Sequence, residues 1–138
     1  MCIRDSSYHD DQKGKVRGDN TIHRILTPDM SLCHLGDLGH LLSGDQISEI
    51  GEVDVLMIPV GGTYTIDASA ACEVINEISP KIVIPMHYQT PHCILPIAPL
   101  DEFLELIDGL YPIEFLDTNQ VEITPATGRK VIVLSYDQ

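Results

Sequence analysis

The chain has 138 residues, a hydrophobic content of 43% and a formal net charge of −13. This length and apolar content suit one domain, or part of a larger one, with an ordinary core. The acidic excess disfavours a nucleic-acid partner, because no basic stripe is present to neutralise phosphates. No apolar run is long enough to cross a membrane, so no membrane partner is expected.

The first residues of the chain and its cysteines indicate the cellular compartment. Residues 1–6 lack the apolar stretch of a secretory signal and are interpreted as a non-native or disordered start, before a partial domain at 7–138. The cysteines are Cys2, Cys33, Cys72 and Cys93. They form no C-x-x-C pair, which suits a reducing compartment better than a disulfide framework. We therefore expect a cytoplasmic protein.

The amino-terminal part predicts a loop, a hairpin and a short helix. Residues 1–19 are polar and indicate a loop after at most a short strand. Residues 20–26 and 30–35 are predicted strands, and the Thr-Pro-Asp turn between them makes a hairpin. Ser43 opens a short helix, since its hydroxyl can satisfy a free amide of the first turn.

The middle of the chain predicts a strand–helix–strand unit. Residues 53–60 are almost continuously apolar, as in a strand that is covered on both faces. Residues 67–78 carry an apolar stripe at helical spacing, with Asp67 as the N-cap. Residues 81–86 form the next strand. Such a unit is parallel and right-handed, which predicts an α/β fold.

The carboxyl-terminal part predicts smaller elements. A proline-rich loop follows His87 and leads to an amphipathic helix at about 100–110. Short strands are predicted at 113–116, 121–123 and 130–134, separated by turns.

Two predicted strands end in side chains that bind metals. Asp37 lies between glycines after the first of them, and His87 follows the strand at 81–86. Ligands of α/β proteins gather at the carboxyl ends of the strands. Carboxylate and imidazole suit zinc, and they also suit manganese or iron. The pattern predicts a metal site between these two loops.

Other side chains have both a functional and a plain interpretation. His9 is a third candidate ligand. His40 either supports Asp37 or faces solvent, and Arg17 either meets an anionic group of the substrate or is a solvated loop residue. Gly62 and Thr63 either present groups to the substrate or only form a turn.

Five motifs in order resemble the metallo-β-lactamase fold superfamily, and within it the cytoplasmic subgroup of L-ascorbate-6-phosphate lactonase-like proteins. The motifs are SYHDD at 7–11, RGDNTI at 17–22, HLGDLGH at 34–40, the stretch 54–65, and IPMHY at 84–88. The resemblance implies an αββα sandwich of which this chain is the carboxyl-terminal half.

The resemblance also implies roles for individual residues. His9 corresponds to a ligand of a first metal, Asp37 to the bridge between two metals, and His87 to a ligand of the second. Asp37 and His87 are accordingly the expected catalytic residues. A hydroxide held between the metals would attack a carbonyl or phosphoryl centre, so the expected substrate is a small lactone or phosphoester.

One hallmark of the superfamily is absent. The motif His-x-His-x-Asp-His occurs nowhere in the chain, so only the last three ligand positions are present. We expect this chain to be inactive by itself, with an apolar sheet face that favours aggregation or a homo-oligomer. The alternatives are a metal-free binding or scaffold module and a nuclease of the same superfamily, the latter disfavoured by the acidic charge.

Overall fold

The computed structural model describes residues 2–8 and 19–135. The strands in these ranges are β1 (Cys2–Tyr8), β2 (Asp19–Leu26), β3 (Ser31–His34), β4 (Val55–Pro59), β5 (Ile82–Met86), β6 (Ile113–Phe115) and β7 (Lys130–Val133). The helices are α1 (Gly44–Ile50), α2 (Ala68–Ile78) and α3 (Asp101–Ile107). None of these helices has the length and apolar composition that crossing a membrane requires.

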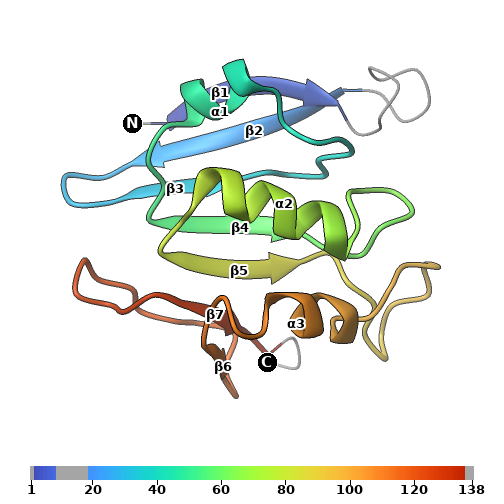
Figure 1. Ribbon diagram of the computed structural model, residues 1–138. Coiled ribbons are helices and arrows are strands. Elements are labelled where there is room, and N and C mark those ends of the chain that lie inside the picture. The colour runs from blue at the N-terminus through green and yellow to red at the C-terminus, as the bar shows by residue number, and fades with distance from the viewer. Residues whose placement is uncertain (1, 9–18, 136–138) are drawn as a thin grey trace.

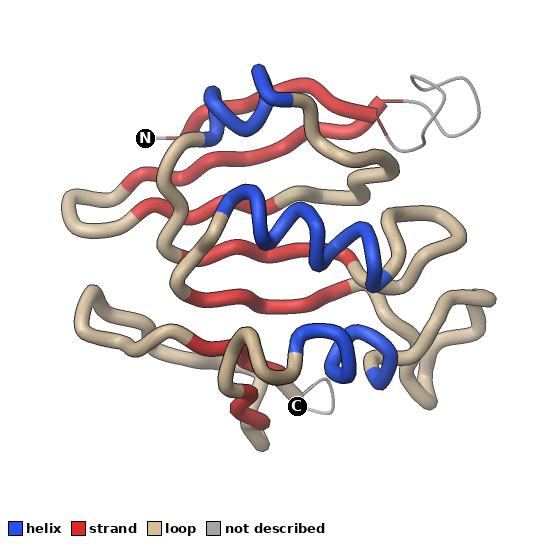
Figure 2. Tube along the Cα trace, viewed as in Figure 1, coloured by secondary structure: helices blue, strands red, loops and turns tan. Residues whose placement is uncertain are grey.

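The strands form one mixed sheet in the order β1-β2-β3-β4-β5-β7-β6. The pairs β1–β2 and β2–β3 are antiparallel, as the predicted hairpin requires, and the remaining pairs from β3 to β6 are parallel. Strands β3, β4 and β5 therefore end at the same edge, where their loops leave the sheet (Figure 2). The predicted α/β fold and its strand–helix–strand unit are confirmed.

The main core lies between the sheet and the helices, which all cover one face (Figure 1). Its fully buried members include Leu56, Ile58 and Val83 of the sheet, Ala71, Val74 and Ile75 of α2, and Phe103 and Ile107 of α3. Because β4 is covered by α2 on this face and flanked by strands on both sides, its carboxyl end is firmly placed. The loop that follows β4 starts from this fixed position.

The two predicted N-caps are present. Ser43 accepts a hydrogen bond from the Gln46 amide, and the Gln46 side chain accepts one from the Ser43 amide, which makes a capping box at α1. Asp67 accepts from the Ala70 amide over 2.9 Å and starts α2. A short polar residue in front of an apolar stripe was thus a sufficient signal for where each helix begins.

The opposite face of the sheet carries a second, smaller apolar cluster. Val55, Ile82 and Ile132 are buried there, and Leu116 and Ile123 pack against them. This face is therefore partly covered within the chain itself, by residues that precede β7. The expected exposure of a complete apolar face is wrong for these positions.

The predicted strand at 121–123 is also wrong. These residues form no strand and lie between two turns: the Thr127 amide donates to the Thr124 carbonyl, and the Thr118 hydroxyl donates to the Gln120 carbonyl. Ile123 contributes to the second apolar cluster instead of to the sheet. Its apolar character reflects packing rather than strand pairing.

The amino terminus differs from the expected loop. Residues Cys2–Tyr8 form a seven-residue strand that pairs with β2 along its whole length, from Cys2 opposite Ile25 to Tyr8 opposite Asp19. The strand continues through residues 6 and 7, and the division into a start at 1–6 and a partial domain at 7–138 stays a prediction. An edge strand needs no apolar run, because backbone pairing on one side can hold polar residues in place, and the sequence pattern therefore missed it.

Candidate metal centre

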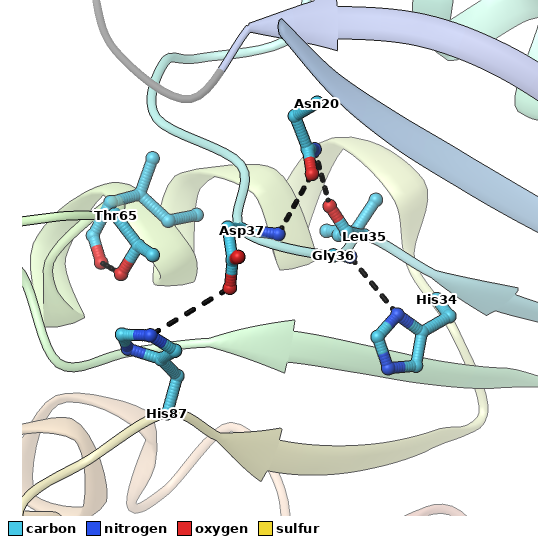
Figure 3. Close-up of polar contacts among 8 residues, drawn as sticks. Asn20, His34, Leu35, Gly36, Asp37, Thr65 and His87 are labelled. Atoms are coloured by element: carbon cyan, nitrogen blue, oxygen red, sulfur yellow. Dashed lines mark hydrogen bonds and ion pairs between the residues drawn. The ribbon is translucent and has the colours of Figure 1, made fainter. Parts of the chain in front are cut away.

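Asp37 and His87 come together at the carboxyl edge of the sheet. Asp37 follows β3 and His87 follows β5, with β4 between these strands. The side chains point toward each other, and the Asp37 Oδ1 atom lies 3.7 Å from the His87 Nε2 atom (Figure 3). The side chains are 48% and 28% exposed, respectively, so the space beside them is open to solvent.

The geometry of this pair fits a shared metal ion. A separation of 3.7 Å is too long for a hydrogen bond. Two ligand atoms of a tetrahedral zinc, each at about 2.0–2.1 Å, lie roughly 3.4 Å apart. The Nδ1 atom of His87 is buried and has no hydrogen-bond partner, although buried polar atoms normally have one. Because Nε2 is the atom that faces Asp37, it is the nitrogen that would bind a metal there, and the unpartnered Nδ1 atom adds no ligand to the site.

The backbone at His87 adopts an unusual conformation. Its φ angle is 57°, in the left-handed region that costs energy for residues other than glycine. Strained residues of this kind cluster at functional sites. Gly61, just after β4, makes the arrangement possible, because a Cβ atom there would overlap the His87 carbonyl oxygen. The ends of β4 and β5 are thus packed as closely as backbone atoms allow.

The loop that carries Asp37 is held by Asn20 of β2. The Asn20 Nδ2 atom donates to the Leu35 carbonyl over 2.8 Å, and the Asp37 amide donates to Asn20 Oδ1 over 2.9 Å (Figure 3). Asn20 lies in the RGDNTI motif at 17–22 but was not among the candidate site residues. The register of the hairpin could have indicated its role, because a hairpin that pairs His23 with His34 places residue 20 opposite residue 37.

His34 holds the same loop from its other side. The Gly36 amide donates to the His34 Nδ1 atom over 3.0 Å, so this nitrogen carries no proton. Burial lowers the pKa of His34 below its ordinary value, and the neighbouring His23 lowers that pKa further. Both observations favour the neutral ring in the folded chain.

The lowered pKa of His34 makes stability depend on pH. The unfolded chain binds the proton more readily than the folded chain, so the contribution of His34 is complete above its ordinary pKa of 6.5 and is lost as the pH falls below it. We expect the melting temperature to fall less between about pH 7.5 and about pH 5.5 in His34→Asn than in the unmodified chain. Asn keeps an acceptor near the Nδ1 position. Parallel pH profiles of the two proteins would contradict this.

The remaining candidate residues are placed as follows. The His40 Nδ1 atom lies 2.7 Å from the Leu41 carbonyl oxygen, so this face of the ring is turned to the local backbone. A supporting role of His40 at Asp37 stays a prediction. His9 and Arg17 lie outside the described residues.

The turn after β4 uses its own polar groups. The Gly62 amide donates to the Ile66 carbonyl over 3.1 Å, so it closes the turn and is not directed at a substrate. A contact of Gly62 with substrate through its other backbone atoms stays a prediction. The Thr63 hydroxyl donates to the Pro96 carbonyl over 2.9 Å and ties this turn to the proline-rich loop. Thr63 itself is exposed at the rim.

In the described part of the chain, no three His, Cys, Asp or Glu side chains gather closely enough to hold a metal ion. The centre that the described residues form is therefore the pair Asp37 and His87. A third protein ligand, if it comes from this chain, must come from outside the described ranges.

A comparison with protein families gives this pair a context. The family described as "Beta-lactamase superfamily domain" matches residues 4–87, which include Asp37 and His87. Because this stretch covers more than half of the chain, the chain belongs to the β-lactamase superfamily.

Individual relatives agree with this assignment. The chain is 32% identical over 90 residues to a UPF0173 metal-dependent hydrolase of Thermoplasma acidophilum, with 65% of this chain and 38% of the relative covered. It is 36% identical over 85 residues to a UPF0173 metal-dependent hydrolase of Staphylothermus marinus, with 61% and 36% covered. The chain thus spans less than two-fifths of either relative.

The fold comparison covers nearly the whole chain. A Thermotoga maritima protein assigned to the Zn-dependent hydrolases of the metallo-β-lactamase superfamily superposes with a TM-score of 0.83 and 38% identity. The match covers 96% of this chain and 63% of that protein. The expected metallo-β-lactamase-like fold is confirmed, and this chain makes up a part of it.

Proposed function

We propose that this chain supplies Asp37 and His87 as metal ligands of a metal-dependent hydrolase that acts on a small molecule. The observation that carries the proposal is the 3.7 Å approach of the Asp37 carboxylate to the His87 imidazole at the carboxyl edge of the sheet. The names of the curated relatives support the same reaction class. A divalent metal bound there would activate water and neutralise the charge that develops on a carbonyl or phosphoryl oxygen.

Asp37 and His87 would have different roles as metal ligands. The Asp37 carboxylate contributes a negative charge, and the His87 imidazole contributes a neutral nitrogen donor. Both side chains are open to solvent on one side, which leaves room for a substrate. We include His9 as a third ligand and two metals in the complete site. Zinc is the first choice for the metal, with manganese or iron as alternatives.

The proposal also covers the class of substrate and the activity of this chain in the absence of the rest of the fold. A lactone or phosphoester fits the subgroup that the sequence resembles, whereas the fold by itself selects no reaction. The described residues offer two protein ligands, whereas a catalytic zinc site ordinarily has three. We therefore propose that this chain binds one metal and does not hydrolyse substrates by itself.

The convergence of Asp37 and His87 favours this function over a metal-free scaffold, because a scaffold would not need a strained His87 that faces a carboxylate. A nuclease is disfavoured by the charges around the site. Of the described cations, Lys81 and Lys130 lie at the amino ends of β5 and β7, at the edge opposite His87. No basic groove is formed beside the site by the described residues.

The proposal is tested by equilibrium dialysis of the purified chain against zinc, followed by elemental analysis. We expect about one zinc per unmodified chain and almost none per Asp37→Ala chain, since that change removes one of the two ligands that the described residues offer. Neither protein should hydrolyse lactone or phosphoester substrates. Equal zinc contents would remove Asp37 from the site, and metal-dependent hydrolysis by the unmodified chain would overturn the proposed inactivity.

A further inference from the structure

We infer that Asn20 is a positioning residue that fixes the backbone of Asp37 and so sets the metal affinity of the site. This inference rests on the proposed function. It concerns a side chain on β2 that touches neither substrate nor metal and acts through Asp37 alone. Its basis is a set of hydrogen bonds that hold the loop between β3 and Asp37.

A single amide group holds both ends of the loop segment. The Asn20 side chain donates to the Leu35 carbonyl over 2.8 Å and accepts from the Asp37 amide over 2.9 Å. The two atoms belong to one planar group, so a shift of either Leu35 or Asp37 would break one of the two hydrogen bonds. The pair of bonds therefore fixes the position and the direction of the backbone at Asp37. We call this arrangement the Asn20 clamp.

The clamp lies where the regular pairing of the sheet stops. The β2–β3 register extends to His23 opposite His34 and no further. Beyond that point the loop turns away, and a side chain takes over from backbone pairing. The Leu35 amide still donates to the Met57 carbonyl over 3.1 Å, so the loop is held on both sides just before it reaches Asp37.

Gly36 allows the clamp to close. Its φ angle is +62°, which glycine adopts without strain. A Cβ atom at Gly36 would lie 2.5 Å from Asn20 Oδ1 and 2.9 Å from the Thr21 carbonyl oxygen. The glycine is thus required both by its conformation and by the close approach of Asn20, and the HLGD motif keeps this space free for the amide.

The clamp matters for metal binding because Asp37 lies on an exposed loop, where the position of its backbone decides where its carboxylate can reach. Its side chain is 48% exposed and lies on a loop. Productive ligand geometry requires placement within about 0.5 Å. Removal of groups that orient a metal ligand commonly weakens metal affinity by about 10- to 100-fold. We expect a loss of about this size when the Asn20 amide is removed.

The test compares Asn20→Ala with Asn76→Ala, a matched change at an exposed position of α2. Cobalt affinity and the visible absorption spectrum of the bound cobalt report on the metal site. Hydrogen exchange of the Asp37 amide, measured without metal, reports on the clamp alone. Asn20→Asp is the second variant: it keeps the acceptor for the Asp37 amide and serves in the exchange measurement if Asn20→Ala does not fold.

We expect Asn20→Ala to bind cobalt about 10- to 100-fold more weakly, with an altered spectrum and faster exchange at Asp37, whereas Asn76→Ala changes none of these. Faster exchange with unchanged affinity and spectrum would overturn the inference, because the clamp would then be structural only. Unchanged exchange at the Asp37 amide in Asn20→Ala would decide against the clamp itself. In Asn20→Asp, slow exchange at the Asp37 amide would support the clamp, because the acceptor is kept, and exchange as fast as that of a freely exchanging loop amide would decide against it. If the unmodified chain binds no cobalt, the proposed function fails, the effect on affinity fails with it, and exchange still decides on the clamp.

Discussion

The His87→Ala variant is expected to bind zinc at least about 100-fold more weakly than the unmodified chain. This magnitude is the upper end of what the loss of a group outside the ligand set costs, and a direct ligand should cost no less. The described residues offer only Asp37 beside His87, so no described His, Cys or Glu side chain can replace the lost imidazole. Competition with a chromophoric chelator measures the affinity.

A double-variant cycle tests whether the two side chains share one metal. If they do, either single change removes most of the affinity, and the combination of Asp37→Ala with His87→Ala costs little more than either alone. His92→Ala is the control, because His92 lies on an exposed part of the proline-rich loop. Additive losses would place Asp37 and His87 at separate metals, and an unaffected His87→Ala would remove His87 from the site.

Sequence and structure agree most closely where burial on both faces dictates the pattern. The continuous apolar run of β4 and the helical stripe of α2 could be predicted, because each must satisfy packing against its neighbours along its whole length. The edge strand β1 could not, since a polar strand held by pairing on one side has no apolar period. At residues 121–123 a strand was predicted where none forms, because an apolar side chain there packs against the sheet without its backbone joining the sheet.

The candidate site was partly predictable for a related reason. Asp37 and His87 follow strands, and the rule that parallel strands end at one edge was enough to bring them together. The left-handed backbone of His87 and the amide contacts of Asn20 depend on three-dimensional packing that no local pattern encodes. The hydrogen bond of the Gly62 amide was missed because a glycine pair alone does not reveal where its amides point.

The Gly61→Ala variant is expected to lose both stability and metal affinity. Gly61 has an ordinary φ angle, so alanine suits its backbone conformation and the effect comes from space alone. The added Cβ atom would overlap the His87 carbonyl oxygen and lie 3.3 Å from the Ile97 Cβ atom. A backbone atom cannot rotate away as a side chain can, so the ends of β4 and β5 must separate.

Separation of these strand ends would strain the hydrogen bonds that join them. The Val60 amide donates to the Met86 carbonyl over 3.1 Å and joins the two ends directly. The Ala98 amide, in the loop that follows β5, donates to the Gly61 carbonyl over 2.7 Å and would be disturbed as well. Overpacking of this kind costs about 1–3 kcal/mol, which lowers the melting temperature by roughly 4 °C per kcal/mol in a domain of this size. His87 moves with its strand end, so zinc affinity should fall as well.

Gly128→Ala provides the matched control for this change, because a Cβ atom at Gly128 would meet no heavy atom within 4 Å. Its free energy of unfolding should stay within about 0.5 kcal/mol of the unmodified value, and its zinc affinity should not change. Thermal unfolding without metal separates the loss of stability from the loss of binding. If Gly61→Ala keeps the melting temperature and the zinc affinity of Gly128→Ala, the close approach of β4 to His87 does not hold the imidazole in place, and its left-handed backbone must be maintained by the loop that follows β5.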